Sequence, residues 1–161
     1  ALASQQKATA ARAAGRFKDE IVPVTIPQKK GDPLMFDADE FIKADATAES
    51  LAKLRPAFDK EGTVTAANAS GLNDGAAAAV LMTEQEASRR GIQPLARIVG
   101  HATYSQAPEW FTTAPVAAID KLLKQVGWTV DQVDLFEVNE AFAVVAMAPI
   151  PAKKKRLSSS L

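Results

Sequence analysis

Hydrophobic and polar positions along this chain follow a helical pattern in four segments. These predicted helices are residues 1–14, 48–54, 84–90 and 114–126. The last of them is amphipathic, because Val116, Ile119 and Leu123 lie on one face. A glycine follows three of the four segments directly, at the position where helices commonly end in a left-handed residue. We therefore expect three well-terminated helices and one short one.

Apolar and β-branched runs between these helices predict strands. Residues 76–82 carry no polar side chain and suit either a strand buried on both faces or a buried helix; we favour the strand. Residues 95–104 and 133–138 predict two more strands. Residues 21–26 predict a weak strand at a sheet edge or a bulge, because Pro23 cannot donate a hydrogen bond to a ladder. Strands that alternate with helices predict an α/β fold with parallel crossovers.

Composition excludes several classes of protein. The 161 residues carry 19 Lys plus Arg and 19 Asp plus Glu, a balance that argues against nucleic-acid binding. No apolar run approaches the roughly 20 residues that a membrane span needs, so we expect no membrane insertion. We expect a cytoplasmic protein, with mitochondrial and peroxisomal locations left open. Cysteine is absent, which excludes disulfides and any cysteine nucleophile from this chain.

Metal binding is not expected. His101 is the single histidine, and without cysteine or a second histidine it cannot assemble a typical zinc site. We interpret His101 as structural.

The last residues break the alternation of helices and strands. Residues 149–161 contain the basic run at 153–156 and a serine-rich end, with neither period nor apolar core. We interpret this segment as a disordered, solvated tail. A phosphate or nucleic-acid contact through the basic run is an alternative, and it predicts binding that depends steeply on salt.

Two short segments carry candidate chemistry. Asn139 follows the strand predicted at 133–138 and precedes a helix predicted to begin within 139–143. Its amide could donate a hydrogen bond, directly or through water, to an oxygen that becomes anionic in acyl chemistry. It could equally be a helix N-cap, for which Asn is among the best residues.

The second segment is residues 68–75, where small residues around Ser70 leave backbone groups open to a narrow polar ligand. A tight turn with no ligand explains the same residues, because the segment ends in Asn73-Asp74-Gly75.

Residues 62–78 read GTVTAANASGLNDGAAA and residues 138–143 read VNEAFA. Both strings closely resemble the thiolases, specifically the biosynthetic acetyl-CoA acetyltransferases. The resemblance extends from residue 1 to about residue 147, which is nearly all of this chain but well under half of a thiolase. It implies an α/β, thiolase-like fold that is present only in part.

The resemblance also implies a reaction. Thiolases join two acetyl-CoA into acetoacetyl-CoA and CoA, or run the reverse thiolysis. They use a cysteine that accepts the acyl group, a second cysteine that moves a proton, a histidine in a Gly-His-Pro motif, and an asparagine in the Asn-Glu-Ala-Phe motif. Asn139 matches that asparagine, which holds the water lining one oxyanion hole.

The resemblance implies a coenzyme A site, with acetyl-CoA and CoA as substrates and no covalently bound cofactor. Ser70 matches a serine that hydrogen-bonds the pantetheine moiety, and Ala141 and Phe142 match positions that line the pantetheine tunnel. Ser50 and Lys43 fall where the family's loop domain meets the CoA nucleotide. Some members have Arg at the position of Lys43, and the two side chains are not equivalent at a bidentate contact.

Three of the four catalytic groups of a thiolase are missing. There is no cysteine and no Gly-His-Pro motif, and His101 is followed by Ala102. We therefore expect an internal fragment of an acetyl-CoA acetyltransferase that is inactive alone. Its expected partners are the remaining thiolase segments, in a family that forms homodimers or homotetramers.

The implied organisation has three parts. Residues 1–66 correspond to the latter part of the CoA-binding loop domain, residues 67–148 to portions of the N- and C-terminal core halves, and residues 149–161 to a tail outside the family pattern. The alternative is a non-catalytic CoA-binding or protein-interaction module derived from the thiolase fold.

Overall fold

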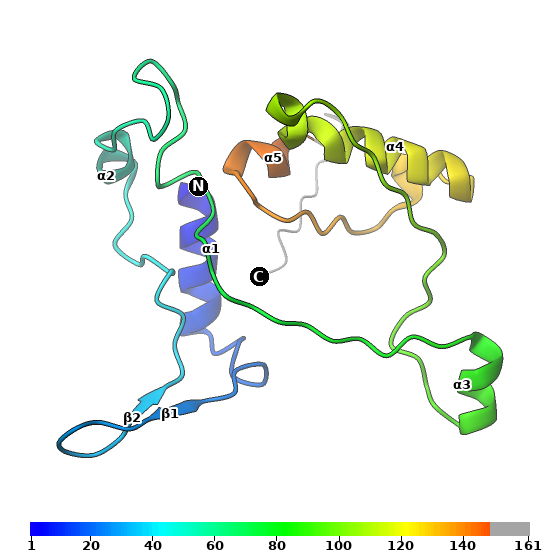
Figure 1. Ribbon diagram of the computed structural model, residues 1–161, viewed down its shortest axis with the longest axis horizontal. Helices are drawn as coiled ribbons and strands as arrows, with labels where there is room; N and C mark the ends of the chain where they lie inside the picture. Colours follow the sequence, from blue (N-terminus) through cyan, green and yellow to red (C-terminus); the bar gives the residue numbers. More distant parts are fainter. Residues whose placement is uncertain (149–161) are drawn as a thin grey trace. The chain divides into compact units, whose positions relative to one another are not determined.

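The computed structural model describes residues 1–148 (Figure 1), and the tail predicted at 149–161 lies outside the described residues. Within the described part, the chain forms two compact units. The first comprises residues 1–71 and 137–144, and the second comprises residues 72–136 and 145–148.

The first unit begins with helix α1 (Leu2–Ala13). Ala8 and Ala11 of this helix are buried, because short side chains allow the rest of the unit to approach closely. Gly15 follows with a positive φ of 69°, and the backbone N–H of Arg16 bonds back to the carbonyl of Ala11 over 3.0 Å. This left-handed ending confirms the predicted helix and its stop.

Two short strands and a short helix complete the first unit. Strands β1 (Val24–Ile26) and β2 (Leu34–Phe36) pair in an antiparallel ladder, with Val24 opposite Phe36. The weak strand predicted at 21–26 is confirmed over its second half, whereas β2 was not predicted. Helix α2 (Ala48–Ala52) begins with a capping box formed by Thr47 and Ser50.

The second unit contains two of the predicted helices. Helices α3 (Glu84–Arg90) and α4 (Ala114–Val126) match their predicted ranges, and both end at a left-handed glycine, Gly91 with φ 64° and Gly127 with φ 72°. A 3₁₀ helix, Pro108–Thr113, leads directly into α4. These ends were predictable because glycine adopts positive φ without steric cost.

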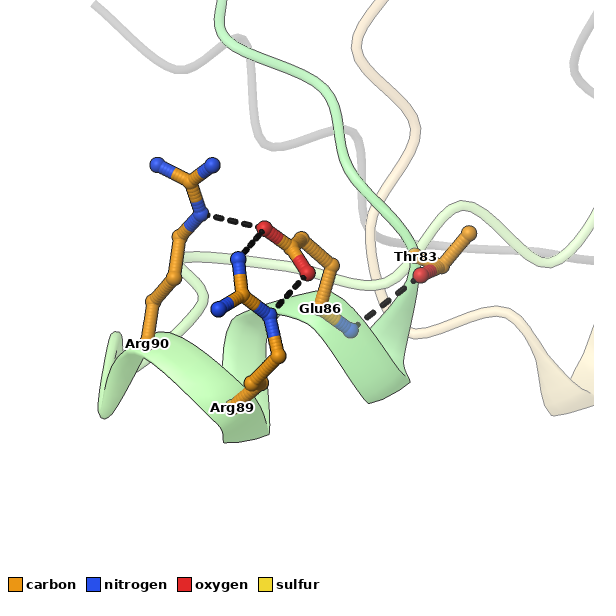
Figure 2. Close-up of polar contacts among 4 residues, drawn as sticks. All are labelled: Thr83, Glu86, Arg89 and Arg90. Atoms are coloured by element: carbon orange, nitrogen blue, oxygen red, sulfur yellow. Dashed lines mark hydrogen bonds and ion pairs between the residues drawn. The ribbon is translucent and has the colours of Figure 1, made fainter.

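Charged side chains and a cap stabilise α3 (Figure 2). Thr83 Oγ1 accepts a hydrogen bond from the backbone N–H of Glu86 over 3.2 Å. The guanidinium of Arg89 donates to both carboxylate oxygens of Glu86, each over 2.7 Å, and Arg90 Nε also donates to that carboxylate. The hydrogen bonds from Arg89, and then those from Arg90, lower the pKa of Glu86 below its ordinary value.

The three apolar strand predictions are wrong for the described part of the chain. Residues 76–82, 95–104 and 133–138 form no paired strand there and lie along irregular backbone (Figure 1). Most large apolar side chains of 76–82 and 95–104 are exposed, with Val80 at 86% and Leu95 at 106% of full exposure, whereas Val133, Phe136 and Val138 are half-buried. A strand exists only when its backbone groups bond to a neighbour, and the described residues provide none here.

The helix expected to begin within 139–143 starts at the end of that range, as α5 (Ala143–Met147). Val145 of α5 joins Ala8, Ala11 and Ala87 in the small set of buried apolar residues within the described part. Local helical signals are thus realised, whereas little of the apolar surface is buried.

Candidate functional site

The two segments with candidate chemistry lie against each other in the first unit. Ala69 and Phe142 form an isolated antiparallel bridge. The backbone N–H of Ser70 donates to the carbonyl of Ala141 over 3.1 Å, and the N–H of Ala143 donates to the carbonyl of Asn68 over 2.8 Å. These two hydrogen bonds place Ser70, Ala141 and Phe142 at one site.

The side chain of Asn68 fixes the loop on one side of this bridge. Its Oδ1 accepts from the backbone N–H of Thr65, and its Nδ2 donates to the carbonyl of Thr63, both over 2.9 Å. An Asn side chain that bonds nearby backbone groups imposes a turn. Asn68 therefore shapes the loop that carries Ser70, a role that sequence reasoning did not assign to it.

Helix α1 meets the other side of the bridge. Ser4 Oγ, in the first turn of α1, donates to Glu140 Oε2 over 2.7 Å. Glu140 stands directly between Asn139 and Ala141. The contact ties the segment after residue 138 to a helix at the opposite end of the sequence.

A cavity of about 160 Å³ lies where these elements meet. Its polar lining includes the side chains or backbone of Ser4, Gln5, Asn68, Ser70 and Glu140. Of the six predicted site residues, Ser70 lines this cavity, and the other five do not: Asn139, Ala141, Phe142, Ser50 and Lys43. Ser4, Gln5 and Glu140 were not predicted as site residues, because only folding brings helix α1 to the cavity beside residue 140.

Asn139 is exposed and does not cap α5. Phe142 directly precedes α5, so the N-cap position falls on Phe142 and not on Asn139. The backbone carbonyl of Asn139 accepts from the N–H of Ala141 over 2.9 Å. The N-cap explanation for Asn139 therefore does not hold, and its side-chain amide is accessible.

Lys43 and Ser50 lie in the segment between β2 and the end of α2. The backbone N–H of Lys43 donates to Gln5 Oε1 over 2.7 Å, and its ammonium donates to the carbonyl of Glu40 over 2.8 Å. Ser50 Oγ accepts from the N–H of Thr47 over 3.0 Å as part of the capping box. Both side chains are exposed, and both make local contacts.

No metal site is formed by the residues described here, which contain no group of three or more His, Cys, Asp and Glu suited to an ion. His101 is exposed in the second unit. That unit has its own hollow of about 450 Å³ beside α3, and no predicted site residue lines it.

Family models match most of the chain. Residues 1–85 match the thiolase N-terminal domain, and residues 92–158 match the thiolase C-terminal domain. The second match runs past residue 148, where we expected the family pattern to end.

Curated relatives share more than half of the aligned residues. The acetyl-CoA acetyltransferase of Chromobacterium violaceum is 61% identical over 146 residues, which cover 91% of this chain and 37% of the relative. The acetyl-CoA acetyltransferase of Shinella zoogloeoides is 62% identical over 148 residues, which cover 92% of this chain and 38% of the relative. The chain thus spans little more than a third of the length of these relatives.

Solved structures agree with this similarity. The Bacillus anthracis acetyl-CoA acetyltransferase matches with a TM-score of 0.80 and 48% identity, over 91% of this chain and 37% of that one. Human mitochondrial 3-ketoacyl-CoA thiolase matches with a TM-score of 0.75 and 40% identity over the same shares. Among residues 1–148, no helix has the length and apolar character needed to cross a bilayer.

Proposed function

Because this chain belongs to the thiolase family and has part of the thiolase fold, we propose that it supplies part of the coenzyme A site of an acetyl-CoA acetyltransferase. The reaction is the condensation of two acetyl-CoA to acetoacetyl-CoA and CoA, or the reverse thiolysis. The observation that carries the proposal is the bridge between Ala69 and Phe142, which brings the two motif strings together.

Ser70 is proposed to bind the pantetheine arm of CoA. Its backbone N–H donates to the carbonyl of Ala141. Ser70 is exposed and lines the cavity, which the apolar residue Phe41 also lines. Pantetheine combines amide groups with a narrow aliphatic chain, and such a lining suits both. Ala141 and Phe142, held on the same bridge, are proposed to line the tunnel for this arm.

Asn139 is proposed to stabilise an oxyanion through a bound water. Asn139 is exposed, and it does not serve as the N-cap of α5. Transfer of an acyl group between thiolates passes through a tetrahedral oxyanion, which fixed donors stabilise. Ser50 and Lys43 are proposed to contact the CoA nucleotide, where the ammonium of Lys43 would attract phosphate.

The nucleophile has to come from another polypeptide segment. The 161 residues contain no cysteine, and a serine or threonine hydroxyl needs an adjacent base to accept an acyl group. We propose that the partners are the remaining thiolase segments and that the chain alone is inactive. The exposed apolar residues of 76–82 and 95–104 support the proposed partners, because large exposed apolar patches are typical of surfaces that another polypeptide segment covers.

Calorimetric titration of the chain with CoA tests the proposed site. We expect saturable binding that the Ser70→Ala variant weakens by about tenfold, the effect of one lost hydrogen bond to a ligand. The matched control is Ser105→Ala, an exposed serine of the second unit, which should bind like the unchanged chain. Equal binding by both variants would contradict the role of Ser70.

Incubation with acetyl-CoA tests the proposed division of labour. We expect no acylated protein and no release of CoA above the protein-free blank. Turnover by the isolated chain would show that it contains its own acyl acceptor, against the proposal.

A further inference from the structure

We propose that Glu140 is a positioning residue, which holds the turn bearing Asn139 against helix α1 through its hydrogen bond with Ser4. This inference rests on the proposed function, because it concerns how the oxyanion donor is oriented.

One side-chain hydrogen bond connects Glu140 to helix α1. Ser4 Oγ donates to Glu140 Oε2 over 2.7 Å, between residues separated by 136 positions in the sequence. Hydroxyl donors to carboxylates make short hydrogen bonds that are roughly twice as strong as those between neutral groups. The carboxylate also stands at the first turn of a 12-residue helix, where the helix dipole favours negative charge.

Glu140 lies in the turn between Asn139 and the residues bonded to the 68–70 loop. On its C-terminal side, Ala141 and Ala143 are bonded to the 68–70 loop through their backbones. On its N-terminal side stands Asn139, whose carbonyl accepts from Ala141. The Ser4 contact therefore attaches the turn to α1 at the residue next to the proposed oxyanion donor.

The Ser4–Glu140 hydrogen bond is independent of the backbone bridge between the two motif segments. The bridge at Ala69 and Phe142 uses backbone groups and does not depend on the Glu140 carboxylate. Loss of the Ser4 contact should leave the Ser70 side of the site in place while Asn139 gains freedom. A fixed donor stabilises an oxyanion because its orientation is set before the reaction, so this freedom would weaken the stabilisation of the oxyanion.

The test is a double-mutant cycle on the full 161-residue chain, with Ser4→Ala, Glu140→Ala and the two combined. The readouts are ¹⁵N relaxation of the Asn139 side-chain amide and hydrogen exchange of the Ala141 backbone amide. Each single variant should speed the Ala141 exchange by about fivefold and lower the Asn139 order parameter, and the double variant should add nothing further.

Two controls sharpen the test. Glu140→Gln keeps an acceptor oxygen for the Ser4 hydroxyl and should restore part of the order, and Ser105→Ala should change nothing. Circular dichroism will show whether α1 persists.

The proposal is overturned if the two single effects are additive, if the Asn139 order parameter is unchanged, or if Glu140→Gln is no better than Glu140→Ala. Should the unchanged chain not bind CoA, the proposed function fails, while the order and exchange readouts still decide whether Glu140 positions the turn.

Discussion

Replacement of Asn68 by alanine should open the bridge that joins the two motif segments. The Asn68 side chain makes two hydrogen bonds of 2.9 Å, one from the N–H of Thr65 and one to the carbonyl of Thr63. Thr63 is exposed, so water can replace the bond to its carbonyl, whereas Thr65 is half-buried and its N–H would be poorly solvated. Asn68→Ala therefore removes one contact that water can replace and one that it cannot.

The size of the effect follows from these two bonds. A net contribution of about 1 kcal/mol per hydrogen bond, with a further penalty for a half-buried donor, gives a loss of about 1–3 kcal/mol. If opening of the loop limits exchange of the Ala143 amide, which bonds to the carbonyl of Asn68, its exchange should speed up by about 5- to 150-fold.

Hydrogen exchange measured by NMR is the assay, with Asn73→Ala as the matched control. Asn73 is exposed and lies beyond the turn, so its loss should leave the Ala143 amide unchanged. Asn68→Asp keeps the acceptor for Thr65 and should fall between the unchanged chain and Asn68→Ala. The reasoning fails if Asn68→Ala and Asn73→Ala exchange alike, because the side chain would then not hold the loop.

Two further predictions concern the second unit. Because Arg89 lowers the pKa of Glu86, the contribution of this carboxylate to the stability of α3 is complete above its ordinary pKa of 4.5 and is lost as the pH falls through the lowered value. The amide chemical shifts of α3 should therefore report fraying of the helix in acid. A Glu86→Gln variant that frays over the same pH range would contradict this. A Cβ on Gly100 would approach Val126 Cγ1 to 2.7 Å. Gly100→Ala should therefore destabilise the end of α4 by about 1–3 kcal/mol and speed the exchange of its amides. Gly75→Ala, with open space around the added Cβ, should do neither. Equal exchange in the two glycine variants would show that this contact is not formed in solution.

Helices in this chain were predictable because their signals are local. The glycines after α1, α3 and α4 end each helix within a residue or two of the expected position. A left-handed residue at a helix end depends on the glycine itself and on few distant contacts.

Strands were not predictable in the same way. Residues 76–82 have the composition of a strand buried on both faces. Such a strand needs paired neighbours and covered faces, and the described residues provide neither. The strand β2, in contrast, was missed because residues 34–36 follow a turn and pair only with β1. Strand formation depends on partners, and a sequence pattern does not show whether they are present.

The candidate site was predictable in part. Ser70, Ala141 and Phe142 were expected to act together, and the backbone bonds between the two segments bring them together. Ser4 and Glu140 were not expected, because one lies on a helix and the other in a loop at the far end of the sequence. No local pattern relates two residues that meet only after folding.

Asn139 is proposed to stabilise an oxyanion, through a bound water, in a thioester site whose sulfur comes from another polypeptide segment. The most direct measurement uses the Shinella zoogloeoides acetyl-CoA acetyltransferase with its aligned stretch of 148 residues replaced by the matching residues of this chain. The chimera should cleave acetoacetyl-CoA, and Asn139→Ala within it should lower kcat by about 100- to 1,000-fold with little change in CoA affinity. A chimera that keeps its full kcat after Asn139→Ala, or that loses CoA binding instead, would contradict the account.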